Sequence, residues 1–121
     1  MKNRIFILFI SIFALLNCGK KQNNIVHFNS VTKECEFVIH NSDLTKNIFA
    51  IKLVFQGEIN NDAVIIIGDG INYKKTYKID KGQVDYIIDT DWYSPKCFIE
   101  YYPENITNGN LCVIYHFFEM L

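Results

Sequence analysis

Apolar and polar residues alternate along much of the chain, in runs separated by Gly, Asn, Asp and Pro. The clearest run covers residues 49–56, where every second side chain is apolar: Phe49, Ile51, Leu53 and Phe55. This period of two predicts a β-strand with one buried face. Residues 34–40, 84–92 and 111–118 alternate in the same way. Residues 63–67 are apolar throughout, which predicts a strand covered on both faces.

Turn signals separate these runs at intervals of about 8–12 residues, the spacing typical of β-sandwiches and small barrels. The short links at 60–62, 69–70 and 80–82 predict antiparallel neighbours, and Asp69-Gly70 fits a tight hairpin turn. The mostly polar sequence of residues 41–47 predicts a loop. The fold class expected is all-β: an antiparallel two-sheet sandwich of immunoglobulin-like character with seven or eight strands. A small β-barrel is the alternative.

The first eighteen residues follow a different pattern. Lys2 and Arg4 precede an uncharged apolar run, Ile5 to Leu16, in which Ser11 is the polar residue. A basic head followed by such a run predicts a secretory signal peptide. The run is shorter than the roughly 20 apolar residues that a spanning helix needs.

The end of this run, Leu15-Leu16-Asn17-Cys18, resembles the lipobox of bacterial lipoproteins. The resemblance implies cleavage before Cys18, a diacylglycerol thioether on its sulfur and acylation of the new amino group. Asn17 departs from the pattern, because Gly, Ala or Ser is commonest there. Gly19, in place of Asp, implies onward transport to an outer membrane if the cell has one.

The chain therefore divides into three expected parts. Residues 1–17 are a lipoprotein signal peptide, residues 18–30 are the lipidated cysteine with a polar tether, and residues 31–121 are the β-sandwich domain. Loss of Lys2 and Arg4 leaves 10 basic against 13 acidic residues, a net charge of −3. No basic face is evident, which argues against nucleic acid as a partner. Attachment to the membrane is expected through the acyl chains.

Three cysteines remain in the expected domain, and all three lie in strand-like runs: Cys35, Cys97 and Cys112. An odd number permits at most one internal disulfide among them. Neither a Cys-x-x-Cys pair nor clustered histidines accompany them, so no metal site is predicted.

Acidic residues form the nearest approach to a chemical cluster. Asp85, Asp89 and Asp91 project from one side of one strand, and Glu100 or Glu104 could join them around Ca²⁺. A row of acids is also ordinary on the solvated face of an antiparallel strand, which is the interpretation favoured here. The three histidines are far apart in sequence, at positions 27, 40 and 116. No catalytic constellation and no cofactor are predicted, so the chain is not expected to be an enzyme.

Aromatic residues suggest a binding role instead. Trp92 and Tyr93 lie at a strand-to-turn corner, where strand alternation leaves one of the two rings exposed. Tyr and Trp are favoured contact residues for proteins and for sugar rings. The sequence predicts a candidate binding corner formed by Trp92, Tyr93 and Tyr102.

The function expected is that of a lipid-anchored cell-envelope protein, acting as a non-catalytic interaction module with a protein partner. A glycan-binding module and an inhibitor of envelope hydrolases of the lysozyme type are the alternatives. A hydrolase that uses Asp89 and Asp91 is the least favoured.

Overall fold

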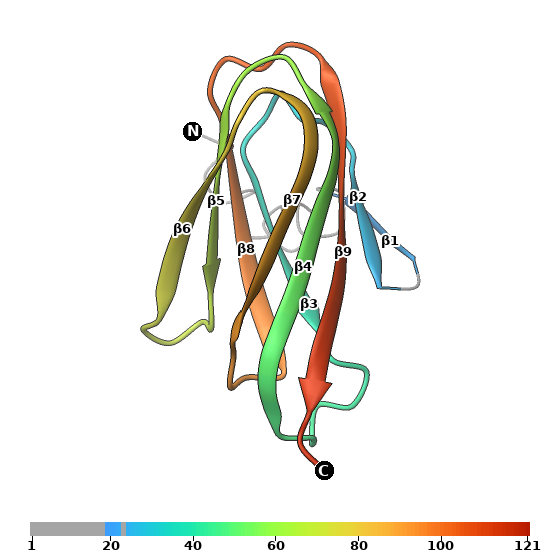
Figure 1. The fold of residues 1–121 in the computed structure, drawn as a ribbon, viewed down its shortest axis with the longest axis vertical. Helices are drawn as coiled ribbons and strands as arrows, with labels where there is room; N and C mark the ends of the chain where they lie inside the picture. Colours follow the sequence, from blue (N-terminus) through green and yellow to red (C-terminus); the bar gives the residue numbers. More distant parts are fainter. Residues whose placement is uncertain (1–18, 23) are drawn as a thin grey trace, which may run out of the picture.

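The computed structural model describes residues 19–22 and 24–121, and these residues form nine β-strands (Figure 1). The signal peptide and Cys18 lie outside the described residues. The strands are β1 (Gly19–Gln22), β2 (Ile25–Phe28), β3 (Cys35–His40), β4 (Ile48–Ile59), β5 (Ala63–Gly68), β6 (Lys74–Ile79), β7 (Gly82–Asp91), β8 (Lys96–Pro103) and β9 (Gly109–Glu119). In this part of the chain, no helix is long and apolar enough to span a bilayer.

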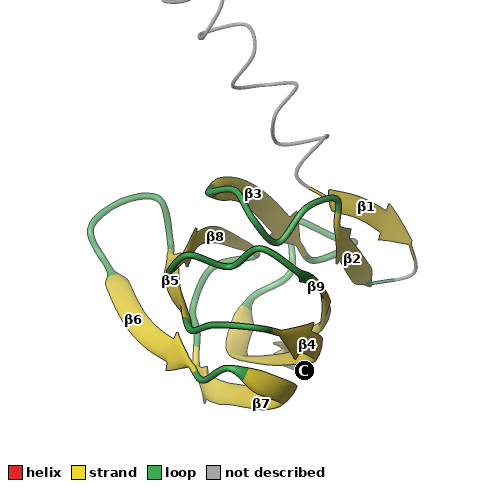
Figure 2. Cartoon of the chain, turned by 90° about the horizontal axis from the view of Figure 1, so that it is seen from above, coloured by secondary structure: helices red, strands yellow, loops and turns green. Residues whose placement is uncertain are grey.

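The strands form two antiparallel sheets that face each other, as the view along the strands shows (Figure 2). The five-stranded sheet has the order β1-β2-β9-β4-β7, and the four-stranded sheet has the order β3-β8-β5-β6. Each sheet has two open edges, so the architecture is the predicted sandwich and not a closed barrel. The all-β prediction is confirmed.

The predicted immunoglobulin-like character concerned the two-sheet architecture, and the strand order now specifies the topology. Strands β2 to β9 pair in the order 2-9-4-7 in one sheet and 3-8-5-6 in the other. This is the order of a jelly roll, in which an eight-stranded ribbon folds over twice. An immunoglobulin domain instead groups its strands as ABED and CFG.

The short links have a different role from the one predicted. Residues 69–73 do join paired neighbours, β5 and β6. Residues 60–62 and 80–81, however, lead from one sheet to the other. Three extended residues span about 10 Å, which matches the distance between packed sheets. A short link is therefore compatible with a crossing between sheets as well as with a hairpin.

The core lies between the sheets and is filled by the inward-facing residues of both. Ile51, Leu53 and Phe55 of β4 are fully buried, as the alternation predicted. Phe49, expected on the same face, is 43% exposed, and Ile48 is buried instead. The pairing of β4 with β9 shifts register between Ile48 and Ala50, and this β-bulge moves Phe49 to the outer face.

The apolar run at 63–67 is covered on one face only. Ala63, Ile65 and Ile67 are fully buried in the core. Val64 and Ile66 point to the outer face of the four-stranded sheet and are half-buried. The prediction of cover on both faces is wrong. Neighbouring side chains of the same sheet shield Val64 and Ile66 in part, so an apolar run of this length does not require a second covering layer.

The described structure also begins earlier than the expected domain boundary at residue 31. Residues 25–28 form β2, which pairs with β9, and Gly19–Gln22 pair with β2. Val26 and Phe28 are buried, and the Phe28 ring lies edge-on to Phe37 and Tyr101 at 5.5 and 5.1 Å between centroids. The stretch expected to be a tether therefore contributes a strand to the sandwich.

Candidate functional site

The predicted binding corner has one buried and one exposed ring, as the alternation required. Trp92 is 2% exposed, and its indole Nε1–H donates a hydrogen bond to the carbonyl oxygen of Lys96 at 2.8 Å. Tyr93 is 74% exposed. Tyr102, the third predicted member, is on β8 and its hydroxyl donates a hydrogen bond to Glu100. The structure therefore brings Trp92 and Tyr93 together and places Tyr102 outside their site.

Trp92 and Tyr93 line a half-open hollow of about 570 Å³, here called the aromatic hollow. This volume lies within the usual range for ligand sites, about 300–1,000 Å³. The hollow lies between the β5–β6 loop, residues 69–73, and the β7–β8 corner, at the end of the sandwich that carries the carboxyl terminus (Figure 1). Its lining consists of Asp69, Ile71, Tyr73, Thr90, Asp91, Trp92, Tyr93, Ser94 and Pro95.

The β5–β6 loop is held in shape by one carboxylate. Asp69 Oδ1 accepts hydrogen bonds from the backbone N–H groups of Ile71, Asn72 and Tyr73 at 2.9, 3.2 and 3.1 Å. These bonds, that from Ile71 foremost, lower the pKa of Asp69 and keep it ionised. The loop has five residues instead of the two expected, because Asp69 closes a wider turn.

Side chains of this loop complete the hollow on one side. Tyr73 is 44% exposed, and its ring lies edge-on to Trp92 with the centroids 5.7 Å apart. Ile71, at the crest, is 88% exposed. Neither residue was predicted for the site, because the alternation from Ile71 to Ile79 is typical of a strand. Their signal was an apolar and an aromatic residue directly after Asp69-Gly70, where turn residues are usually polar.

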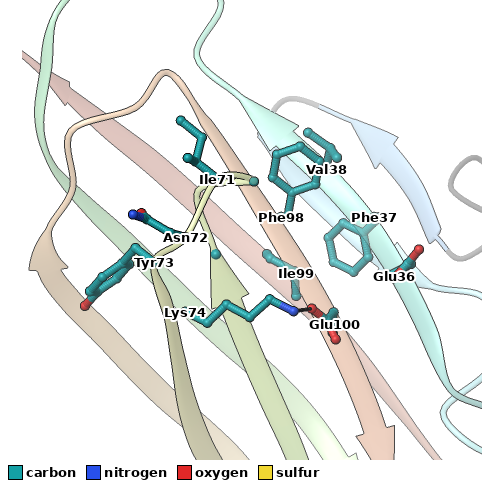
Figure 3. A pocket seen from close by; sticks show the side chains of 12 residues that line it. Glu36, Phe37, Val38, Ile71, Asn72, Tyr73, Lys74, Phe98, Ile99 and Glu100 are labelled. Atoms are coloured by element: carbon teal, nitrogen blue, oxygen red, sulfur yellow. Dashed lines mark hydrogen bonds and ion pairs between the residues drawn. The ribbon is translucent and has the colours of Figure 1, made fainter.

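A second hollow of about 520 Å³ lies on the other side of the same loop (Figure 3). Ile71 and Tyr73 border both hollows. Val38 and Phe98 lie together on its floor, with Ile71 facing them across the opening. At its polar end, Lys74 Nζ lies 3.1 Å from Glu100 Oε2.

Glu100 also accepts a hydrogen bond from the hydroxyl of Tyr102, which links the third predicted aromatic residue to this second hollow. The Tyr102 hydrogen bond, with the nearby Lys74 ammonium, lowers the pKa of Glu100. The carboxylate in turn raises the pKa of Tyr102 to about 12. Glu100 is therefore a partnered anion across the neutral pH range.

The predicted row of acids lies on the outer face of β7. Asp85, Asp89 and Asp91 are exposed and stand opposite Gln56, Lys52 and Ala50 of β4. Of the three, only Asp91 lines the aromatic hollow. Within residues 24–121, no three His, Cys, Asp or Glu side chains gather closely enough to hold a metal ion.

The sequence permits at most one disulfide among Cys35, Cys97 and Cys112, and none of these three pairs with another in this structure. Cys97 and Cys112 are free thiols, so neither pairs with the other or with Cys35. Cys97 and Cys112 lie in different sheets, on β8 and β9. Cys97 is fully buried, and burial raises the pKa of its thiol to about 12.

No known protein family matches this chain, and no curated protein matches its sequence. Among solved structures, the chain is similar to the pre-peptidase C-terminal domain of a collagenase from Bacillus anthracis. That likeness has a TM-score of 0.51 at 8% identity and covers 78% of this chain and 89% of the other. At this identity it supports the sandwich fold and carries no information on activity.

Two further likenesses are weaker. The enzymatically active domain of tailspike protein 4 from bacteriophage CBA120 gives a TM-score of 0.49 at 14% identity. The structure of TmCBM61 in complex with β-1,4-galactotriose gives 0.43 at 9% identity. The tailspike likeness covers 82% of this chain and 18% of the tailspike chain. The TmCBM61 likeness covers 81% of this chain and 66% of the TmCBM61 chain. Neither likeness is strong enough to support an argument about function.

Proposed function

We propose that this protein is a lipid-anchored component of a bacterial cell envelope that binds another molecule through the aromatic hollow and performs no catalysis. The observation that carries the proposal is the 74% exposed Tyr93 ring beside a preformed hollow. An exposed aromatic ring at the edge of a concave site is typical of binding surfaces. The lipid anchor is supported by the lipobox-like sequence that ends in Cys18.

The side chains of the hollow favour binding over catalysis. Its acids are Asp69, which caps a loop, and Asp91 at the end of β7. Neither histidine nor cysteine is among the described residues that line it. Among these lining residues, no histidine is therefore available to act as a general base for the Ser94 hydroxyl.

A protein is the partner that we favour. The hollow and its neighbour share the exposed crest formed by Ile71 and Tyr73, which gives an apolar ridge between two depressions. Such relief suits a protein surface with complementary side chains. A glycan is the second candidate, because the exposed faces of Tyr93 and Tyr73 could stack on sugar rings. An inhibitor of envelope hydrolases would be a special case of the protein partner.

The lipid anchor is tested by labelling growing cells with a fatty acid analogue and following the protein with and without Cys18→Ala. We expect label in the membrane fraction for the native protein and none for the variant. Intact mass of the purified protein gives a second measurement. It shows directly whether the mature chain carries the mass of a diacylglycerol and an acyl group. An unmodified protein in the cytosol would contradict the proposal.

The binding role is tested with the full chain, immobilised and exposed to detergent extracts of envelope and to a glycan array. Tyr93→Ala should lose the retained partner by tenfold or more, an effect of about 1.4 kcal/mol. The matched control is Ile87→Ala, which removes a large residue, 55% exposed, from the outer face of β7. Trp92 is unsuitable for this test, because its replacement would open the core. Equal retention by both variants would exclude the hollow as the binding site.

A further inference from the structure

The aromatic hollow carries negative charge that no lining residue neutralises. Asp69 and Asp91 both contribute carboxylates, and the described lining contains no Lys, Arg or His. The three hydrogen bonds to Asp69 come from neutral backbone N–H groups, so they stabilise its charge without cancelling it. By contrast, the acid of the neighbouring hollow, Glu100, is paired with Lys74.

The aromatic rings of the hollow add to this preference. Tyr73 and Tyr93 are partly and largely exposed, and an aromatic face attracts a cation. Ile71, on the crest between them and the second hollow, offers apolar surface for the methylene groups of a long side chain. A cation on a flexible apolar stem would satisfy both surfaces at once.

Hydrogen-bonding capacity points in the same direction. The best donor of the corner, the indole N–H of Trp92, is already used by the carbonyl oxygen of Lys96. The Ser94 hydroxyl oxygen accepts a bond from the N–H of Lys96. The hydroxyls of the lining both donate and accept, whereas the two carboxylates only accept, so acceptors exceed donors in the hollow. Guanidinium and ammonium groups donate only, whereas sugar hydroxyls need both donors and acceptors.

We propose that the aromatic hollow receives a basic side chain, arginine or lysine, from the partner protein. The carboxylate of Asp91 forms the exposed ion pair, the rings of Tyr73 and Tyr93 flank the cation, and Ile71 contacts its stem. This inference rests on the proposed function and names the chemistry of the partner at that same site. Charge complementarity selects the occupant, and a neutral glycan becomes an alternative outcome of the test.

The test uses NMR on the full chain in detergent micelles. Trp92 is the one tryptophan of the sequence, so the indole N–H gives a single resonance that reports on the hollow. The probes are the peptide acetyl-Gly-Arg-Gly-amide and its citrulline analogue, which replaces the guanidinium by a neutral urea of the same shape. We expect the arginine peptide to shift the Trp92, Tyr73 and Tyr93 signals saturably. The citrulline peptide should bind about tenfold more weakly than the arginine peptide. Added salt should lower the affinity of the arginine peptide.

Asp91→Asn should lower the affinity for the arginine peptide about fivefold, which is the upper end of what an exposed ion pair contributes. The matched control is Asp89→Asn, which removes the same charge from the same face of the same strand outside the hollow. That variant should bind as the native protein does. Equal binding of the two peptides, or equal loss in the two variants, would overturn the inference.

Neutral oligosaccharides, cellotriose and chitotriose, form the other arm. If they shift the same signals while the arginine peptide does not, the inference fails and the binding role of the hollow stands. If no probe shifts these signals, the inference also fails. The retention experiment with Tyr93→Ala then decides the proposed function separately.

Discussion

At the scale of the residue, the shape of the candidate site depends on Asp69 and Gly70. Asp69 closes the β5–β6 loop through three backbone N–H groups. Gly70 has a φ of +85°, and a Cβ built there would lie 2.5 Å from Cε1 of Phe98. Only glycine permits both this backbone conformation and this approach. The backbone of the loop at Gly70 therefore approaches the Phe98 ring closely because Gly70 has no side chain.

Gly70→Ala should destabilise the protein by about 3 kcal/mol, since it combines a positive φ with a clash. Gly82→Ala is the matched control, because Gly82 has a φ of +108° and nothing within 4 Å of the added Cβ. It should cost about 1 kcal/mol from the backbone alone. Urea unfolding measures both losses of unfolding free energy, provided that the dependence of this free energy on urea concentration is the same in each variant. Equal losses in the two variants would contradict the close contact with Phe98.

The Glu100 carboxylate should make stability sensitive to acid. Its pKa in the folded protein lies below the ordinary value of 4.5, mainly through the Tyr102 hydroxyl and then through Lys74. A lowered folded pKa stabilises the protein above the unfolded value, and this contribution is lost as the pH falls through the folded value. Tyr102 has the opposite sign: its contribution is present below pH 10 and is lost as the pH rises towards about 12.

Glu100→Gln should therefore reduce the loss of stability, measured as the denaturant midpoint of unfolding, as the pH falls below the ordinary carboxyl pKa of 4.5. Glu104→Gln, an exposed acid in the β8–β9 connection, is the control and should keep the native slope. The effect should be modest because Glu100 is near the surface, where solvent screens its partners. An unchanged acid slope in Glu100→Gln would exclude this network as its source.

At the scale of the element, alternation located the strands well and the ends of the sandwich poorly. The five apolar runs named above became strands β3, β4, β5, β7 and β9 near the expected positions. Residues 25–28 were missed because a strand of four residues carries only two inward-facing side chains, Val26 and Phe28. A local pattern that short is indistinguishable from chance. The bulge at Ile48 was also hidden, because register depends on the partner strand.

The early strands yield a direct test of the domain boundary. A fragment of residues 31–121 should lose at least about 4 kcal/mol relative to residues 19–121, since it lacks Phe28 and Val26. Phe28 packs between Phe37 and Tyr101, and their contacts would be replaced by a void or by water. Denaturant unfolding of the two fragments measures the difference. Equal stability would show that β1 and β2 are dispensable and that the original boundary was correct.

At the scale of the whole molecule, the sandwich separates two kinds of thiol. Cys97 is fully buried in the core, and its raised pKa leaves it protonated. Cys112 is half-buried on the outward side of β9, next to inward-facing Leu111 and Val113. Thiolate reagents require both access and ionisation. The two residues should therefore differ in reactivity for a reason set by the global fold.

Iodoacetamide should modify Cys112 in the native protein and Cys97 only after denaturant unfolds it. Mass spectrometry of proteolytic fragments measures both. The expected difference in rate is at least about a hundredfold, because the buried thiol reacts through opening of the core. Cys97→Ser is the control, and labelling of Cys112 in this native variant should be unchanged. Rapid native labelling of Cys97 would show that β8 opens locally.

The sequence by itself determined the fold class, the faces of the long strands apart from Phe49, and the exposure of one ring at the Trp92-Tyr93 corner. Each follows from the period of two, a local property of an extended chain. The tertiary structure decided the jelly-roll order, the aromatic hollow and the separation of Tyr102 from Trp92. These depend on which distant strands pair, since Tyr73 and Trp92 meet only when β6 and β7 lie at the same edge of the sandwich in different sheets. Pairing between distant strands is a property of the folded chain that local periodicity does not encode.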